Sequence, residues 1–449
     1  MTAPVFATVS SIFTVGGLIG ALIAGPLASR HGRLPTMRLT AVLFLLGSVA
    51  ETLAGSVTVL GAGRFTTGLG AGAATVVVPV YISEVAPRSQ RGAWGYATQV
   101  GVNVGILLTQ TCGFFWSRGS QWRWILGGGI VAALLQGLAV VAVVPESPEW
   151  IKVNGGEKDK AKGRRIEARI RGRSGGLGEE SGPDDGWSNA ADDGTSGISG
   201  RPEEEGLLNS DGVHGGAPPV PRSASSSSIG HLGFVQVVRD PLYRPAIVAV
   251  VGIMFAQQLC GINSIIMYSV SLLADLLPVS SALLTILISV VNLFMTLACA
   301  PLPDRLGRKA CLLISIVGQG LSSLALAVSI VTGLKIMSAL AVLFFVAFFA
   351  VGLGPVPFIL ASELVGQEAV GATQSWCLAA NYTATFLVAQ FFPIVNQALN
   401  DRFGGPGGWA FFVFAALAAV STAFVAWNVP ETKGKKDADE VWGRTRRID

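Results

Sequence analysis

The sequence predicts an all-α membrane protein of about eleven transmembrane helices in two related halves. Of its 449 residues, 51% are hydrophobic and only 13% are charged, and the mean hydropathy is +0.56. A soluble domain carries about 25% charged residues. Basic residues fall on alternate loops, as in helical membrane proteins, and a set of short polar motifs occurs twice in the same order. These three observations exclude a soluble protein and predict a duplicated helical bundle.

Apolar stretches long enough to cross a bilayer, which takes about 20 helical residues, follow one another along the chain. They cover approximately residues 5–28, 39–56, 58–82, 93–115, 124–144, 243–272, 280–302, 310–333, 336–361, 371–397 and 408–428. We expect them to be helices, because an unpaired backbone group in lipid costs several kcal/mol and the segments lack the alternating pattern of barrel strands.

The basic loops predict the orientation. One set of loops holds Arg30, Arg33, Arg38, Arg88, Arg91, the basic run Lys152 to Arg173, Arg305, Arg308, Lys309 and the tail from Lys433. The opposite loops hold Arg118, Arg123, Lys335 and Arg402 and few other basic residues. By the positive-inside rule the first set is cytosolic, which places Met1 outside the cytosol.

A long polar segment, about Gly155 to His231, separates the two groups of spans. Its basic beginning is compatible with a surface helix, and the remainder is rich in Gly, Ser, Pro, Asp and Glu and predicts a disordered tether. The predicted organisation is an N-terminal bundle at 1–150, a cytosolic basic helix and linker at 151–240, a C-terminal bundle at 241–432 and a cytosolic tail at 433–449. The net charge of +4 shows no nucleic-acid footprint.

The repeated motifs lie at the cytosolic ends of the spans. They are residues 29–33 (SRHGR), 83–85 (SEV) and 145–148 (PESP) in the first half, and 304–309 (DRLGRK), 362–364 (SEL) and 430–432 (PET) in the second. Such duplication is typical of membrane transporters. An Arg facing Glu at neighbouring helix ends forms charge-assisted bonds only while those ends are close, which predicts a cytosolic gate. The alternative is positive charge that merely orients the helices.

Amide side chains within the spans predict a site for a polyhydroxylated ligand. An amide both donates and accepts hydrogen bonds without a charge to desolvate, which suits the hydroxyls of a sugar. The candidates are Gln99, Gln257, Gln258, Asn263, Asn292 and Asn381. Gly261 breaks the span that holds three of them, so that Gln257 and Asn263 can both face a cavity. Hydrogen bonds between helices remain the alternative for any one amide.

The longer motifs resemble the sugar porter family of the major facilitator superfamily, the group of facilitative glucose transporters and fungal hexose carriers. They are Gly63-Arg64, VPVYISE at 78–84, Arg91-Gly92, PESPEW at 145–150, QQLCGIN at 257–263, DRLGRK at 304–309, GLGPVP at 352–357 and PETKG at 430–434. The resemblance covers nearly all of the chain outside the tether. It implies two pseudo-symmetric bundles that carry a hexose or a related sugar or polyol by alternating access.

The resemblance also implies roles for individual residues. Substrate-binding residues would be Gln99, Gln257, Gln258, Asn263 and Asn292, and the aromatic residues Phe358, Tyr382, Phe386 and Tyr268 are placed to cover the apolar face of a sugar ring. The gate would comprise Arg30, Arg33, Glu84, Arg91, Glu146, Arg305, Arg308, Glu363 and Glu431. Phe358 and Tyr382 stand where the better-known glucose carriers have Trp, which weakens an assignment to glucose in particular.

Other positions depart from the family pattern. Glu149 stands where PESPEW usually has Arg, and no Arg in the loop 365–370 mirrors Arg91. The first span, from Ile12 to Gly20, resembles the family's second helix, so the first is missing from this sequence. Either the recorded start lies downstream of the true one, which the intact motifs favour, or the chain is a truncated carrier. Proton-coupled members keep an acidic residue on that helix, which leaves uniport and proton symport open.

Three classes of function compete for this sequence: a sugar carrier, a non-transporting sugar sensor and a membrane enzyme. The sequence has no nucleophile with a base, metal-spaced cluster or phosphate loop, so we expect neither an enzyme nor a cofactor. A sensor would signal through a cytosolic extension, and the tail from Lys433 is short. The expected partners are a sugar and the lipid bilayer, with protons if transport is coupled. The plasma membrane is the expected location, with the vacuole or another internal membrane as the alternative.

Overall fold

The computed structural model describes residues 3–86, 91–116, 119, 121–155, 161, 163, 165–166, 233–265, 281–366, 368–404, 407–435 and 437–444. All regular elements in these ranges are helices. The predicted tether lies largely outside the described residues, as do residues 266–280, which include Tyr268.

The N-terminal half contains six described helices. They are α1 (Ala3–His31), α2 (Arg33–Thr52), α3 (Val57–Val85), α4 (Arg91–Trp116), α5 (Trp122–Ala142) and α6 (Pro148–Asn154). Local signals set the boundaries. Gly32 separates α1 from α2 at φ 105°, which a residue with a side chain rarely adopts, and the Ser56 hydroxyl accepts a hydrogen bond from the backbone of Val59 at the start of α3.

The C-terminal half repeats this pattern. Its helices are α8 (Phe234–Arg239), α9 (Arg244–Leu259), α11 (Ser281–Cys299), α12 (Leu302–Leu306), α13 (Arg308–Val331), α14 (Lys335–Val351), α15 (Val356–Glu363), α16 (Val370–Phe403), α17 (Ala410–Asn428) and α18 (Ala438–Val441). Gly352 and Pro355 lie in the break between α14 and α15, where Pro cannot supply the amide that a continuous helix needs.

Nine of the eleven predicted transmembrane spans are confirmed. Among the described residues, nine helices or helix pairs are long and apolar enough to cross a membrane. The predicted span 93–115 is the 26-residue helix α4, and the span 280–302 corresponds to α11, in which Thr285–Cys299 is the apolar part. Every predicted span therefore has a helical counterpart.

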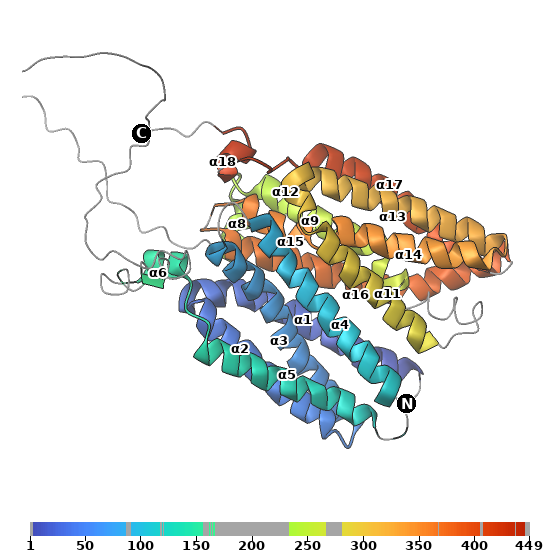
Figure 1. The fold of residues 1–449 in the computed structure, drawn as a ribbon, viewed down its shortest axis with the longest axis horizontal. Helices are drawn as coiled ribbons and strands as arrows, with labels where there is room; N and C mark the ends of the chain where they lie inside the picture. The colour runs from blue at the N-terminus through green and yellow to red at the C-terminus, as the bar shows by residue number, and fades with distance from the viewer. Residues whose placement is uncertain are drawn as a thin grey trace, which may run out of the picture.

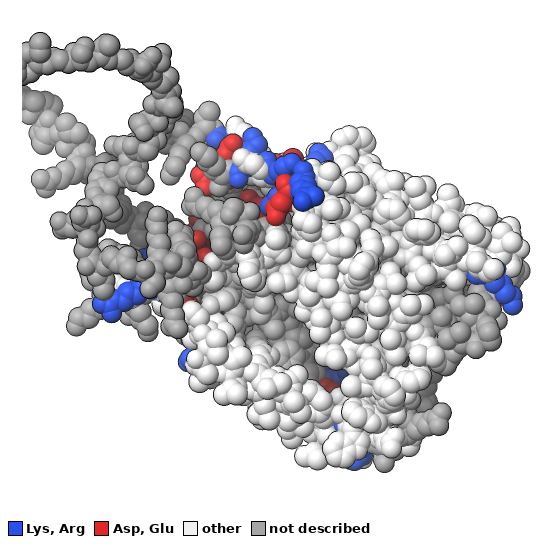
Figure 2. Space-filling model, in the orientation of Figure 1, with Lys and Arg blue, Asp and Glu red and all other residues white. Residues whose placement is uncertain are grey.

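The two halves lie side by side, and the most extensive contacts between them are those of α1 with α16 and of α4 with α11 (Figure 1). We call the α4–α11 contact the amide seam, because Asn103 of α4 bonds to Asn292 of α11 across it. The short helices α6, α8 and α18 lie at one end of the bundle (Figure 1). Figure 2 shows charged side chains gathered at that end around α12 and α18, above flanks almost free of charge. The positive-inside rule predicts that this end faces the cytosol, and we call it the cytosolic end on the basis of that prediction.

Candidate functional site

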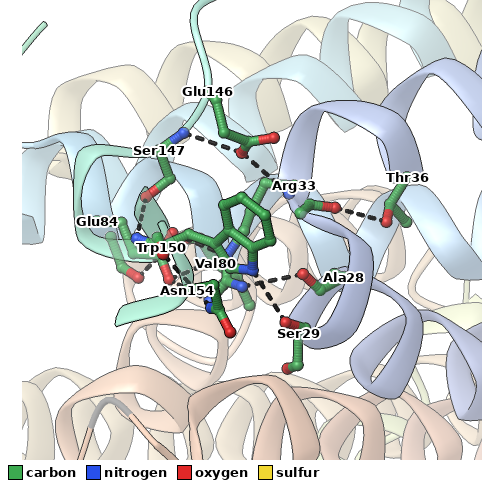
Figure 3. A network of polar contacts seen from close by, with 12 residues as sticks. Ala28, Ser29, Arg33, Thr36, Val80, Glu84, Glu146, Ser147, Trp150 and Asn154 are labelled. Carbon is green, nitrogen blue, oxygen red and sulfur yellow. Dashed lines mark hydrogen bonds and ion pairs between the residues drawn. The ribbon is translucent and has the colours of Figure 1, made fainter. Parts of the chain in front are cut away.

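The N-terminal half carries a buried ion-pair network at its cytosolic end (Figure 3). The Arg33 guanidinium binds Glu84 through two nitrogens: Nε donates to Oε2 at 2.9 Å and to Oε1 at 3.1 Å, and Nη2 donates to Oε1 at 2.5 Å. The remaining nitrogen, Nη1, donates to the carbonyl of Ala28 at 3.0 Å. The Glu146 carboxylate accepts from the backbone N–H of Arg33 at 3.0 Å and of Leu34 at 3.1 Å. Glu146 therefore caps the N-terminus of α2, whose first amides have no partner within the helix.

The C-terminal half builds the same network from the repeated motif. Arg308 bonds to Glu363 through Nε at 3.1 Å and Nη2 at 2.9 Å, and Nη1 donates to the carbonyl of Pro303 at 3.1 Å. Glu431 accepts from the backbone N–H of Arg308 at 2.8 Å and of Lys309 at 3.1 Å, which caps α13. Each network therefore ties together three cytosolic segments of its own half.

Two glycines make this capping possible. Gly32 and Gly307 have nearly the same backbone angles, φ 105° with ψ 163° and φ 103° with ψ 157°. A Cβ atom on Gly32 would lie 2.6 Å from Glu146 Oε2, and one on Gly307 would meet Glu431 even more closely. The glycine in each motif is thus required both for its conformation and for the space occupied by the capping carboxylate.

The expected gate has three further residues. Arg30 and Arg305 are exposed, and the side chain of Arg91 lies outside the described part of the structure. Among the described residues, the ion pairs of Arg33 and Arg308 stay within one half. The six remaining positions of the expected set form two triads, Arg33–Glu84–Glu146 and Arg308–Glu363–Glu431.

A cavity of about 1240 Å³ lies between the two networks at the cytosolic end. Arg33 and Glu84 line it from one half, and Arg308 and Glu363 line it from the other. It also reaches Phe358, which lies farther from the cytosolic end of α15 than Glu363 does. The cavity therefore connects the charged cytosolic end with one of the expected substrate-binding residues.

Tyr243 lines the same cavity beside the C-terminal network. Its hydroxyl donates to Glu368 Oε1 at 2.5 Å. Burial, followed by this hydrogen bond, raises the pKa of Tyr243 above its ordinary value. The tyrosine therefore stays a neutral donor that holds the loop before α16 against the start of α9.

Four of the predicted amides form one chain within the C-terminal half. Gln257 lies at its centre, donating to the carbonyl of Leu353 at 2.6 Å and accepting from Asn381 at 2.5 Å and from Gln258 at 3.3 Å. Asn263 donates to Gln258 at 2.7 Å. Gly261, at φ 95°, ends the regular helix between these residues, as the sequence predicted. The chain joins α9 and α16 to the break before α15.

The other two predicted amides lie at the amide seam. Gln99 donates to Asn103 at 3.1 Å, and Asn103 exchanges two hydrogen bonds of 3.4 Å with Asn292. Asn103 also donates to Thr296 Oγ1 at 2.8 Å. Gln99, Asn103, Asn292 and Thr296 are all buried. The predicted amides therefore form two groups, one inside the C-terminal half and one bridging both halves.

The three described aromatic candidates, Tyr382, Phe358 and Phe386, lie in different surroundings. Tyr382 of α16 packs across to the first half, so closely that a Cβ atom on Gly17 would lie 2.5 Å from its ring, and its hydroxyl bonds to Thr75 of α3. Phe358 is partly buried and lines the cavity. Phe386 is 39% exposed and faces away from the core. Tyr382 and Phe358 thus remain candidates for contact with a ligand.

Sequence reasoning missed Asn103, although the signal was present. Asn103 is an amide inside a predicted span, one helical turn after Gln99, so the two share a face of α4. It also missed Glu51, which is buried in α2, accepts from Thr67 at 2.6 Å and lies 3.6 Å from Arg64 of α3.

The chain is similar to sugar transporters over nearly its whole length. The model of the family "Sugar (and other) transporter" matches residues 2–179 and 223–441. A probable metabolite transport protein of Saccharomyces cerevisiae is 33% identical over 444 residues, which cover 98% of this chain and 83% of that protein. The human facilitated glucose transporter member 3 of solute carrier family 2 is 30% identical over 439 residues, which cover 96% and 79%.

Solved structures share the fold. The proton:xylose symporter XylE, bound to 6-bromo-6-deoxy-D-glucose, superposes with a TM-score of 0.73 at 22% identity, over 98% of this chain and 89% of that one. A partially occluded inward-open form of XylE from E. coli gives 0.67 at 24% identity, over 96% and 89%.

Proposed function

This chain belongs to the sugar porter family of the major facilitator superfamily, and we propose that it carries a hexose or a related sugar or polyol by alternating access. Members of the family are integral membrane sugar carriers and not enzymes. The proposal concerns the class of sugar, the residues that bind it and the way the halves move.

The amide chain around Gln257 carries the proposal. Its four amides are bonded mainly to one another, and Gln257 also bonds to the backbone at the break before α15. A sugar hydroxyl donates and accepts like an amide, so it can replace such a bond at little net cost. The same break begins the helix that carries Phe358 into the cavity. A ring bound there would place its hydroxyls on the amides and its apolar face near Phe358.

The paired networks support movement of each half as a unit. Each triad fixes the cytosolic ends of three segments within one half, and the cavity separates the two triads. In the proposed cycle, closure of this cavity brings the two triads together. The contacts between the halves, α4 with α11 and α1 with α16, repack at the same time. The role of the triads as a gate rests on this arrangement.

Radiolabelled uptake into transporter-null cells tests the substrate. We expect saturable uptake of D-glucose, D-xylose or a polyol such as sorbitol. Gln258→Ala and Asn292→Ala should each weaken apparent affinity about two- to twelvefold with normal membrane insertion, because each removes a hydrogen bond worth about 0.5 to 1.5 kcal/mol. Unchanged kinetics in both variants would remove these residues from the site.

Thiol labelling tests alternating access. Ser83 lines the cytosolic cavity, so Ser83→Cys in a background without the native cysteines reports how open that cavity is. A saturating sugar should change the labelling rate, since a ligand redistributes a carrier between its states when its affinity for them differs. An identical rate with and without a sugar that is transported would argue against a cytosolic gate at this position.

A proton gradient imposed on the same cells distinguishes uniport from symport. Proton-coupled uptake would accumulate sugar above its external concentration and collapse with a protonophore, whereas uniport would only equilibrate it.

A further inference from the structure

We infer that Asn103 is a positioning residue of the sugar site. When the site is empty, Asn103 is hydrogen-bonded to Gln99 of one half and Asn292 of the other, and it releases both amides when a sugar binds. The inference rests on the proposed function. It adds a residue through which sugar binding changes the hydrogen bonds between α4 and α11, and so the contact between the two halves.

Asn103 joins the two sides of the proposed site. Through its side-chain oxygen it accepts from Gln99 of α4, at 3.1 Å, and from Asn292 of α11, at 3.4 Å. Its side-chain nitrogen donates to Asn292 at 3.4 Å and to Thr296 at 2.8 Å. Gln99 and Asn292 are the proposed sugar ligands on opposite sides of the amide seam, and Asn103 contacts both.

The strengths of these bonds are unequal. The bond to Thr296 has an ordinary length, whereas the two bonds to Asn292 lie at the long limit for a hydrogen bond. Asn103 is only 2% exposed, so its amide needs partners in every state of the carrier. The short bond to Thr296 can persist while the weaker pairing with Asn292 is exchanged for a sugar hydroxyl.

The side chains are placed for such an exchange by helix geometry. Gln99 and Asn103 lie one turn apart on α4, and Asn292 and Thr296 lie one turn apart on α11, so each pair presents a single face to the other helix. A buried Asn between two transmembrane helices gains only a modest net energy from its hydrogen bonds. Packing alone would be served as well by an apolar residue of the same shape, such as Leu.

Removing the competing amide should therefore strengthen sugar binding. In the empty carrier, Asn103→Leu leaves the amides of Gln99 and Asn292 without Asn103 as a hydrogen-bond partner. In the sugar-bound carrier, these amides bond to the sugar, so the substitution removes nothing from them. The destabilised empty state should raise the affinity for D-glucose or D-xylose about three- to tenfold. A purely structural role for Asn103 predicts the opposite, because damage to the seam would weaken binding.

The experiment measures equilibrium binding of radiolabelled D-glucose and D-xylose to the purified full chain in detergent, in a double-mutant cycle with Asn292→Leu. We expect Asn103→Leu to raise affinity when Asn292 is present and to have little effect when it is replaced. Asn103→Thr, which can keep a bond to Thr296, should give the same gain and serves if the leucine variant does not fold.

Gln110→Leu is the matched control. Gln110 accepts a hydrogen bond across the same seam from Ser289 of α11, whereas the hydrogen bonds of Asn103 go to Gln99, Asn292 and Thr296. Its replacement removes a hydrogen bond between the halves without releasing a ligand-binding amide, so affinity should not change.

The outcomes separate the two proposals. If Asn292→Leu weakens binding but neither Asn103 variant strengthens it, the role of Asn103 is overturned and the sugar site stands. If Gln110→Leu strengthens binding as much as Asn103→Leu, loosening of the seam explains the gain and the role of Asn103 is again overturned. If Asn292→Leu leaves affinity unchanged, or neither sugar binds saturably, the proposed site fails and this inference fails with it.

Discussion

The two halves repeat one ion-pair network in different surroundings. In both, an Arg binds a Glu through two nitrogens, and a second Glu caps the helix that the Arg begins. The side chains of Arg33 and Glu84 are 3% and 2% exposed, whereas those of Arg308 and Glu363 are 10% and 19% exposed. The C-terminal network also holds Asp304, 3.0 Å from Arg308, where the first half has Ser29. Duplication thus preserved the geometry while the burial of the charges diverged.

The halves also differ in how their outer helices are covered. By the order of the repeated motifs, α4 and α5 correspond to α16 and α17. In the C-terminal half, α9 packs against both α16 and α17. No helix in the described N-terminal half takes the equivalent place against α4 and α5. Of the residues in the apolar stretch of α5, 11% are buried, whereas 33% of those in the apolar stretch of α17 are buried. An apolar helix is therefore buried only to the extent that a neighbour covers it.

The largest expected difference contrasts α17 with α5. Phe414 of α17 is buried against Phe392 and Gly261, while Leu138 of α5 is 66% exposed. Phe414→Ala should destabilise the folded chain by about 3 to 5 kcal/mol, because it leaves a cavity, and Leu138→Ala by less than about 1 kcal/mol. Thermal unfolding in detergent measures the stability of both variants. Equal losses would contradict the conclusion that α17 is covered by its neighbours to a greater extent than α5.

The next contrast removes the arginine from each network. Arg33→Ala leaves Glu84 buried without its partner, which should cost about 3 to 5 kcal/mol. Arg308→Ala should cost about half as much, since water reaches Glu363 and its Oε2 still accepts from Thr432 at 2.6 Å. The same unfolding assay compares the pair. A larger loss for Arg308→Ala would show that burial does not set the strength of these networks.

The glycines test what the halves share. Gly32→Ala and Gly307→Ala should each cost about 1 to 3 kcal/mol, since each forces a side chain into a conformation that favours glycine and against a capping carboxylate. The two losses should agree within experimental error, in contrast to those of the arginines. Clearly unequal losses would mean that the matching backbone angles do not carry matching strain.

The smallest effect concerns the additional acid of the C-terminal network. The side chain of Asp304 is 33% exposed and pairs with Arg308, four residues later and across the break at Gly307. Asp304→Asn should therefore cost only about 0.3 to 0.5 kcal/mol. The introduction of the equivalent acid into the first half, Ser29→Asp, should not raise stability by more than this. A loss above 2 kcal/mol for Asp304→Asn would make Asp304 an essential member of the network.

The sequence by itself predicted the positions of the transmembrane helices and the residues of both Arg–Glu networks, and the orientation in the membrane stays a prediction. These features depend on local properties, because hydropathy marks a span and loop charge marks its cytosolic end. Glu146 and Glu431 were predicted as members of the gate, whereas their capping of α2 and α13 was found only in the structure. The six amides were recognisable by their position within apolar spans, and the family resemblance implied a sugar-binding role for five of them, Asn381 excepted.

Only the tertiary structure decided which of these residues meet. It closed each Arg–Glu network within one half, divided the amides into two groups and brought Asn103 to Asn292, 189 positions away in the chain. The physical reason is that such contacts depend on how each helix is rotated about its own axis. A helix that is apolar on nearly every side, such as α5 or α17, carries almost no sequence signal for that rotation, and the packing of its neighbours sets it.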